Sequence, residues 1–396
     1  MKIPALIACV ASAMSVGWAG AAERFRPAAP DYVVMHVPAR AAHDPIASLE
    51  QRYAQAPDAG TAAALAALYV ERARSQREAR YFGRAEMLLQ PWLAKPDVSA
   101  ATLRVQADIL QNRHDFAGAL RLLDDAIARD PRDAGARLMR ASVKVVQGHA
   151  VDARADCAAV LASGESAAGT VCFAQVLGST GHLAQAEALL NTLLTRIASS
   201  GAARAPSASP LGISADVLGW ALWLSADFAD RRGDAHAAEA QLREAMKATP
   251  TNEGVRSALA DLLIARGAFR EALAVVDLPA PSTGLLARRA RAQQLLRDPG
   301  LSATRAQLDD VVTLARRRGE IPHLREEALV ALDVDGDAAR ALQLATQNFA
   351  TQRETIDARL LVRAARAQGD REAFELVTRW MRATGFEDKA ITEIRS

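Results

Sequence analysis

The amino-acid sequence predicts an all-α fold, a solenoid of about nine helix–turn–helix repeats. Three observations support this prediction. Small residues recur about every 34 residues along most of the 396-residue chain. Each period contains two stretches with apolar residues at helical spacing, and a glycine commonly separates the two stretches. Alanine is abundant, which favours closely packed helices because alanine has the highest helix propensity and a small side chain.

Residues 1–22 have the features of a secretory signal peptide. Lys2 gives a short positive start, an apolar stretch follows over 3–18, and small residues allow cleavage after Ala21 or Ala22. A membrane anchor fits less well because the segment is short. No later run is long and apolar enough to span a bilayer. We therefore expect no stable membrane insertion of the mature chain, and a periplasmic or secreted location.

Residues 23–60 are expected to form an N-terminal extended arm and a capping helix. The segment 23–44 contains several prolines and shows no helical period. The helix is expected from about Pro45 to Gln55, directly before the repeats.

The repeat is defined by one small residue in each unit. Successive positions are 33–35 residues apart, except for one step of 52. We expect this residue to lie near the start of the second helix of a hairpin, where the two helices cross too closely for a larger side chain. The positions are Ala85, Ala119, Ala153, Ala186, Ala238, Ala272, Ala306 and Ala341, with Phe374 in the last place.

Other recurring residues mark the ends of the helices. Pro131 and Pro250 end their units because proline cannot continue a helix. A glycine five residues before the repeated alanine is expected to end the first helix in a left-handed conformation. These glycines are Gly148, Gly181, Gly233, Gly267 and Gly336. Matching small residues on the first helix, twelve positions before the alanine, are Ala107, Ala141, Ala174, Ala226 and Ala260.

The single long step coincides with residues 198–214, which are rich in Ser, Ala, Pro and Gly. This composition is typical of a flexible surface loop. The loop separates repeats over 61–197 from repeats over 215–396. It is either an insertion within one continuous solenoid, which we favour, or a division into two blocks.

The period, the paired alanines and the proline that ends a unit resemble the tetratricopeptide repeat, a 34-residue helical hairpin. The resemblance covers roughly residues 62–394, and it is weaker around Ala306 and Phe374. It implies a right-handed superhelix. It also implies that the first helix of each unit lines a concave groove, which in this family binds an extended peptide or a partner helix.

Counting from the repeated alanines gives the residues expected to point into that groove. Tryptophan is enriched at binding hot spots, but a register shift of one residue would make Trp223 the aromatic residue that this repeat family often buries early in its first helix. The arginines could bind carboxylates through two hydrogen bonds each, or could lie on a solvated surface. The candidate groove residues are Trp220, Trp223, Asp227, Asp230, Arg288, Arg291, Arg359, Arg363 and Arg366.

We find no sequence pattern of an enzyme or of a cofactor or metal site. The nucleophile elbow, the zinc-protease motif, the phosphate-binding loop and the dinucleotide fingerprint are all absent. A net charge of +2 without a clustered basic stretch argues against nucleic-acid binding. Four histidines, His114, His149, His182 and His236, fall in the turns within hairpins, where we expect exposed polar side chains.

Cys157 and Cys172 remain after removal of the signal peptide. They could form a disulfide in an oxidising compartment, or could be buried free cysteines. The sequence leaves both possibilities open.

These features together predict a non-catalytic scaffold or adaptor in the bacterial cell envelope that binds a partner protein or peptide in its groove. The alternative is a chaperone-like assembly or biogenesis factor for an envelope enzyme, a transporter or a secreted polymer.

Overall fold

The computed structural model of the chain describes residues 44–76, 80–199, 213–278, 281–317 and 323–394. The predicted signal peptide, the segment 23–43 and most of the loop 198–214 lie outside the described residues. The described residues from Ile46 onward belong to one compact unit. No helix in these ranges is both long and apolar enough to cross a bilayer.

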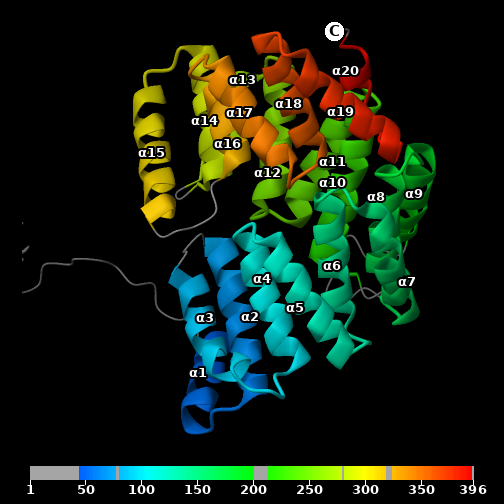
Figure 1. The fold of residues 1–396 in the computed structure, drawn as a ribbon, viewed down its shortest axis with the longest axis vertical. Helices are drawn as coiled ribbons and strands as arrows, with labels where there is room; N and C mark the ends of the chain where they lie inside the picture. Colours follow the sequence, from blue (N-terminus) through cyan, green and yellow to red (C-terminus); the bar gives the residue numbers. More distant parts are fainter. Residues whose placement is uncertain (1–43, 77–79, 200–212, 279–280, 318–322, 395–396) are drawn as a thin grey trace, which may run out of the picture. The chain divides into compact units, whose positions relative to one another are not determined.

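The described residues form α1 (Pro45–Gln55), nine helical hairpins and a final short helix α20 (Lys389–Thr392) (Figure 1). The all-α solenoid expected from the sequence is confirmed. The first helices of the hairpins are α2 (Ala59–Gln76), α4 (Ala100–Asn112), α6 (Ala134–Val146), α8 (Ser166–Gly178), α10 (Ala215–Arg231), α12 (Glu253–Ala265), α14 (Thr283–Leu296), α16 (Leu324–Asp333) and α18 (Thr355–Gln368). The second helices are α3 (Arg80–Leu93), α5 (Phe116–Arg129), α7 (Arg154–Ala162) preceded by a 3-10 turn (Ala150–Ala153), α9 (Leu183–Ser199), α11 (Ala235–Ala248), α13 (Phe269–Val276), α15 (Leu301–Arg317), α17 (Ala338–Phe349) and α19 (Arg371–Thr384).

In the described hairpin turns a left-handed residue precedes the second helix, and a side-chain cap often follows it. The five glycines expected there all have positive φ, between 69° and 88°. An aspartate often follows and caps the second helix, since the Asp234 carboxylate accepts a hydrogen bond from the Ala237 amide. In the second unit a histidine takes the glycine's place, and His114 has φ 62°. The turns therefore follow from local sequence.

The recurring alanines lie where the helices cross. Seven of the predicted leading residues, from Ala85 to Ala272 and then Ala341, have no exposed surface. The matching alanines of the first helices are also buried, with at most 2% of their surface exposed. The predicted close approach of the two helices is confirmed in these hairpins.

The predicted register is wrong in two units. Ala306 is exposed, and Thr304 is the buried residue near the start of α15. In most hairpins the buried residue is the fourth of the second helix, and Thr304 is the fourth residue of α15. In the last hairpin the smaller Ala373 is buried, whereas its neighbour Phe374 is only partly buried. A crossing that holds alanine elsewhere has no room for phenylalanine.

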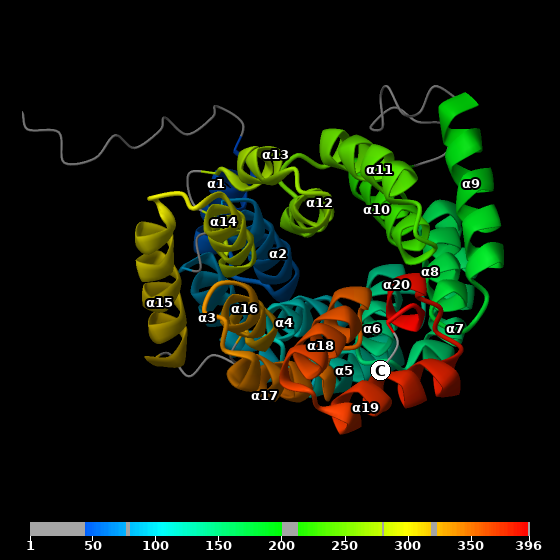
Figure 2. The ribbon, with the colours of Figure 1, turned by 90° about the horizontal axis from the view of Figure 1, so that it is seen from above.

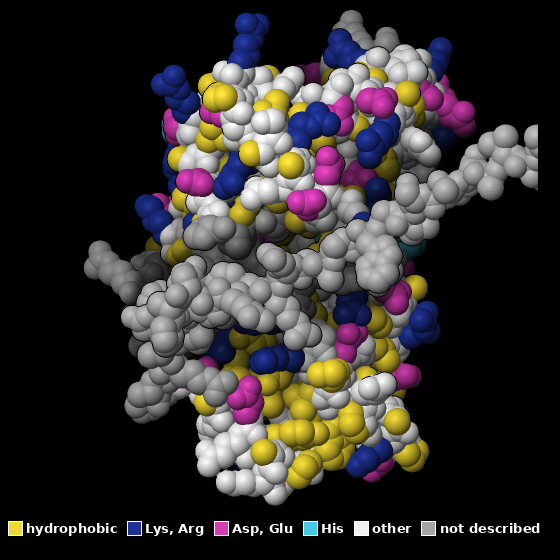
Figure 3. Space-filling model, turned by 90° about the vertical axis from the view of Figure 1, so that its left-hand side faces the viewer, with side chains coloured by type: hydrophobic (Ala, Val, Ile, Leu, Met, Phe, Trp, Pro, Cys, Tyr) yellow, Lys and Arg dark blue, Asp and Glu magenta, His cyan; other side chains and the backbone are white. Residues whose placement is uncertain are grey.

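The first hairpin has another hairpin on one side only. Helix α1 covers part of its other side through Ile46, Leu49 and Tyr53, and the indole of Trp92 donates a hydrogen bond to the Tyr53 hydroxyl. Apolar side chains still gather at this lower end in the face shown in Figure 3, and Met87 is 71% exposed. A terminal repeat keeps some of the apolar surface that a middle repeat would bury.

The solenoid is continuous across the step of 52 residues. Helix α10 packs against both α8 and α9, and α9 ends at Ser199, two residues into the predicted loop 198–214. The stack then curves until the C-terminal hairpin lies beside α6 and α8 (Figure 2). The amide of Arg353 donates a 2.7 Å hydrogen bond to the carbonyl of Val146. This bond joins the loop between α17 and α18 to the end of α6. The curvature encloses the candidate site.

Candidate binding cavity

The first helices of the hairpins surround one cavity of about 1520 Å³. Seven of the nine first helices contribute lining residues, and the other two, α4 and α6, contribute only at their ends. The seven are α2, α8, α10, α12, α14, α16 and α18. This arrangement agrees with the groove position that the resemblance implies. Seven of the nine candidate groove residues line the cavity. They are Trp223, Asp227, Asp230, Arg288, Arg291, Arg359 and Arg363.

The two tryptophans of α10 have different surroundings. Trp223 is partly buried, packs against the core shared by α10–α14, and lines the cavity. Trp220 is not among the cavity residues. It packs against two cores, one with Val171 and one with Cys157. Trp220 lies almost one turn before Trp223 and packs on residues of α7 and α8, so its predicted place in the groove is wrong, and it lies in the packing between hairpins.

The aspartates of α10 are paired with the C-terminal hairpin. The Asp227 carboxylate accepts a 2.6 Å hydrogen bond from the Thr355 hydroxyl. The Asp230 carboxylate accepts one from the guanidinium of Arg359, which also donates to Asp388. Burial tends to lower the pKa of Arg359, but these two carboxylates raise it above its usual value. These side chains hold two distant parts of the chain together.

Arg288, Arg291 and Arg363 are paired with carboxylates of neighbouring hairpins. Arg288 is 4% exposed and donates two hydrogen bonds, of 2.9 and 2.7 Å, to Asp261. Arg291 and Arg363 both contact Asp333. These pairs correct the expectation of arginines that are free to bind a partner's carboxylates. Arg366 is exposed and is not among the cavity residues.

The sequence does not single out Arg231 of α10, and yet it is the most buried arginine among the described residues. It is 2% exposed, and its guanidinium donates to the carbonyls of Gly178 and Glu387, at 2.6 and 2.8 Å. The guanidinium lies 3.9 Å from the centre of the Phe386 ring. An arginine in the last turn of a helix is usually a solvated charge, so nothing local in the sequence distinguishes Arg231.

His114 also differs from its prediction. His149, His182 and His236 are exposed, as expected, although His236 is the second residue of α11. His114 is partly buried, and its ring lies 5.3 Å from that of His323. Burial, followed by the charge of His323, lowers the pKa of His114 to about 4. In the described ranges, no group of three or more His, Cys, Asp or Glu side chains is placed to hold a metal ion.

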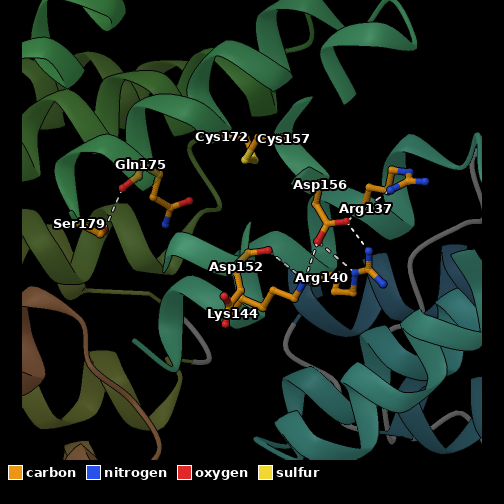
Figure 4. The surroundings of a disulfide bond; sticks show 9 residues. All are labelled: Arg137, Arg140, Lys144, Asp152, Asp156, Cys157, Cys172, Gln175 and Ser179. Carbon is orange, nitrogen blue, oxygen red and sulfur yellow. Dashed lines mark hydrogen bonds and ion pairs between the residues drawn. A yellow bond between two sulfur atoms is a disulfide. The ribbon is translucent and has the colours of Figure 1, made fainter. Parts of the chain in front are cut away.

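Cys157 of α7 and Cys172 of α8 form a disulfide (Figure 4). The adjacent Asp156 has no exposed surface and accepts hydrogen bonds from Arg140, at 3.0 and 2.5 Å, and from Lys144, at 2.9 Å. Burial alone would raise the pKa of Asp156, but these two cations outweigh it and lower the pKa. The disulfide thus joins the third hairpin to the fourth, and the buried ion cluster holds α6 and α7 of the third hairpin together.

Part of the chain matches a known repeat family, and several solved structures are similar to the chain. Residues 231–298 match the tetratricopeptide repeat family. No curated protein matches the chain. Solved structures that resemble it include a tetratricopeptide repeat protein from Parabacteroides merdae, with 14% identity over 81% of this chain and 98% of that one, and a TM-score of 0.36. The TPR domain of P58(IPK) has 14% identity over 89% and 99%, with a TM-score of 0.21. The human IFIT1 dimer with PPP-AAAA has 12% identity over 85% and 94%, with a TM-score of 0.41.

The matched segment contains the left-handed glycines Gly233 and Gly267 and the buried alanines Ala238 and Ala272. The same features recur in hairpins outside it. Residues 231–298 thus match the tetratricopeptide repeat, and hairpins with the same period and the same buried alanines stack on both sides of this segment.

Proposed function

We propose that this chain is a non-catalytic scaffold that binds an extended segment of a partner protein in its central cavity. Tetratricopeptide folds in general are protein-interaction scaffolds. The observation that carries the proposal is the convergence of seven first helices on one cavity of about 1520 Å³. Small-molecule pockets are usually about 300–1,000 Å³, so a cavity of this size favours a chain segment over a small ligand.

The partner's contacts would be mainly apolar and hydrogen-bonded. The cavity arginines and aspartates already pair within the chain, so a partner carboxylate would have to displace an existing partner. Trp223 offers a partly exposed aromatic surface in the same cavity. We therefore expect an apolar or aromatic side chain of the partner to pack on Trp223.

We further propose that the protein works in the bacterial cell envelope. The signal-peptide features of residues 1–22 support export. The Cys157–Cys172 disulfide also fits an oxidising compartment, because disulfides are rare in reducing cytosol.

The test blocks the cavity without changing the stacked hairpins. Ser257 lies on α12 and lines the cavity, so Ser257→Trp would fill part of the cavity. Ala306→Trp is the matched control, because Ala306 is exposed on α15 and is not a cavity residue. Each variant would be purified, checked for helicity, and used with crosslinking to capture proteins from envelope extracts.

We expect the unchanged protein and Ala306→Trp to capture the same protein, and Ser257→Trp to capture at least tenfold less of it. Equal capture by Ser257→Trp would place binding outside the cavity. A stable stoichiometric complex would indicate a scaffold. A transient complex, together with loss of the mature partner after deletion of the gene, would indicate an assembly factor.

A further inference from the structure

The turns of four successive hairpins all contact the C-terminal part of the chain. The turn of the second hairpin meets the start of α16 through the rings of His114 and His323. The next turn meets the loop before α18, where Arg353 binds the carbonyl of Val146. In the fourth hairpin Gly181 lies against Gly385. We call this row of contacts the seam.

The fifth turn completes the seam. A methyl group placed on Gly233 would lie 3.1 Å from Cδ of Lys389, so this turn lies against α20. The four turn residues in contact, at positions 114, 148, 181 and 233, are the equivalent left-handed residue of successive repeats. One structural position, repeated four times, therefore provides the edge on which the C-terminal hairpins dock.

Hydrogen bonds cross the seam between residues more than 120 positions apart. Thr355 donates to Asp227, and Arg359 pairs with Asp230. The Arg231 guanidinium donates to the carbonyl of Glu387, and the Leu183 amide donates to a carboxylate oxygen of the same residue, at 2.8 and 3.3 Å. Arg231 is buried, so its bond to the Glu387 carbonyl is shielded from water and costly to break.

The contact of Gly181 with Gly385 is the tightest part of the seam. Both residues have positive φ, 79° and 75°. A Cβ on Gly385 would lie 2.9 Å from the Cα of Gly181 and 3.1 Å from its nitrogen. Backbone atoms cannot rotate aside as a side chain can, so the seam accepts no side chain at this point.

We propose that the segment Gly385–Thr392 is a latch that closes the solenoid on itself and controls entry to the cavity. Residues on both sides of the seam line the cavity, Asp227 and Asp230 on one side and Thr355, Arg359 and Phe386 on the other. Release of the latch would move these two walls apart and widen the cavity. The identity of the cavity as a partner site rests on the proposed function, but closure of the solenoid does not.

The test compares two glycines with the same backbone. Gly385 and Gly369 end α19 and α18 in left-handed conformations, with φ 75° and 72°. A Cβ on Gly369 meets nothing within 4 Å. Gly385→Ala and Gly369→Ala therefore share the strain of a left-handed alanine, and only Gly385→Ala clashes across the seam. The comparison separates latch release from general destabilisation.

Two measurements report closure without any partner. Nitroxide labels on Val151→Cys and Glu372→Cys, exposed residues on the two sides of the seam, give their distance by pulsed electron resonance. The rate at which a bulky polyethylene-glycol maleimide modifies Ser257→Cys reports entry to the cavity, because Ser257 lines it.

We expect one narrow distance in the parent and in Gly369→Ala, and a longer, broader distribution in Gly385→Ala. We also expect maleimide modification at least tenfold faster in Gly385→Ala. A narrow, unchanged distance in Gly385→Ala, or a broad distance in the parent, would overturn the proposal. If Gly385→Ala does not fold, the double variant Thr355→Ala and Asp230→Asn, which removes two hydrogen bonds across the seam, replaces it with the same expected results.

Discussion

One residue position in each repeat shapes both the hairpins and the seam. The spacing of the repeat predicts a left-handed residue there, and Gly148, Gly181 and Gly233 confirm it. The spacing cannot predict what packs on the turn from elsewhere in the chain. His114 was expected to be exposed for this reason, whereas the start of α16 covers it.

The lowered pKa of His114 predicts a pH-dependent stability. Its pKa is about 4 in the folded protein and about 6.5 in the unfolded chain, so between these values only the unfolded chain binds the proton. The free energy of unfolding should fall as the pH decreases from 6.5 to 4, by up to ~1.4 kcal/mol per pH unit from this group. Above pH 6.5 the group should contribute no pH dependence.

The control for this prediction is His114→Asn, because asparagine tolerates the left-handed conformation and does not titrate. Urea unfolding would be measured for both proteins from pH 7.5 to 4.5. The difference in unfolding free energy between them should change with pH only below about 6.5. A constant difference over the whole range would show that the histidine is protonated in the folded protein as readily as in the unfolded chain.

Substitution of the two tryptophans of α10 should have different effects, one on stability and the other on partner binding. Trp220 packs between two cores, so Trp220→Ala should lower the unfolding free energy by ~3 kcal/mol and leave partner capture unchanged. Trp223→Ala should reduce partner capture at least tenfold. Urea unfolding and the crosslinking capture described above measure the two effects. The opposite pattern would place the binding surface on Trp220.

At the scale of helices, the period predicts which segments form hairpins but not every contact between them. The position of the buried small residue depends on where the second helix begins, because it is in most hairpins the fourth residue of that helix. Helix α15 begins at Leu301, so its fourth residue is Thr304. Thr304 is therefore buried and Ala306 is exposed. The cavity arginines show the same limit. Counting places Arg288 on the correct face, but only the structure shows that Asp261 of the preceding hairpin pairs with it.

The disulfide joins α7 to α8 and should raise the free energy of unfolding measurably. The bond closes a loop of 15 residues, for which the chain-entropy estimate is ~3 kcal/mol of stability. The double variant Cys157→Ser and Cys172→Ser should lose about that much in urea unfolding. A reductant should lower the stability of the parent by a similar amount and should not affect the double variant. Equal stability of the two proteins in the absence of reductant would contradict this role.

At the scale of the whole solenoid, the seam could not be predicted from the repeat. The period and the recurring alanines specify contacts between adjacent helices, and the same pattern fits an open superhelix equally well. The seam joins residues far apart in the sequence, such as Leu183 and Glu387, 204 positions apart. It depends on the accumulated curvature of several hairpins, which no single repeat encodes.

The seam should make unfolding more cooperative than in a linear stack of repeats. A linear solenoid is held only by nearest-neighbour contacts, so its repeats can unfold in separate steps. Here the last hairpin also contacts the third, fourth and fifth, so loss of one region removes contacts from another. We expect one urea transition for the parent and for Gly369→Ala, and two transitions for Gly385→Ala.

Hydrogen exchange of single amides should show where in the chain Gly385→Ala loses the stability that the seam provides. The Arg353 amide lies in the loop before α18, and its acceptor is the Val146 carbonyl across the seam. This amide should exchange as slowly as those of the helix cores in the parent and in Gly369→Ala, and at least a hundredfold faster in Gly385→Ala. Rapid exchange of Arg353 in the parent would mean that the seam opens independently of global unfolding. Slow exchange in all three proteins would mean that the contact of Gly181 with Gly385 is not what holds the C-terminal hairpins in place.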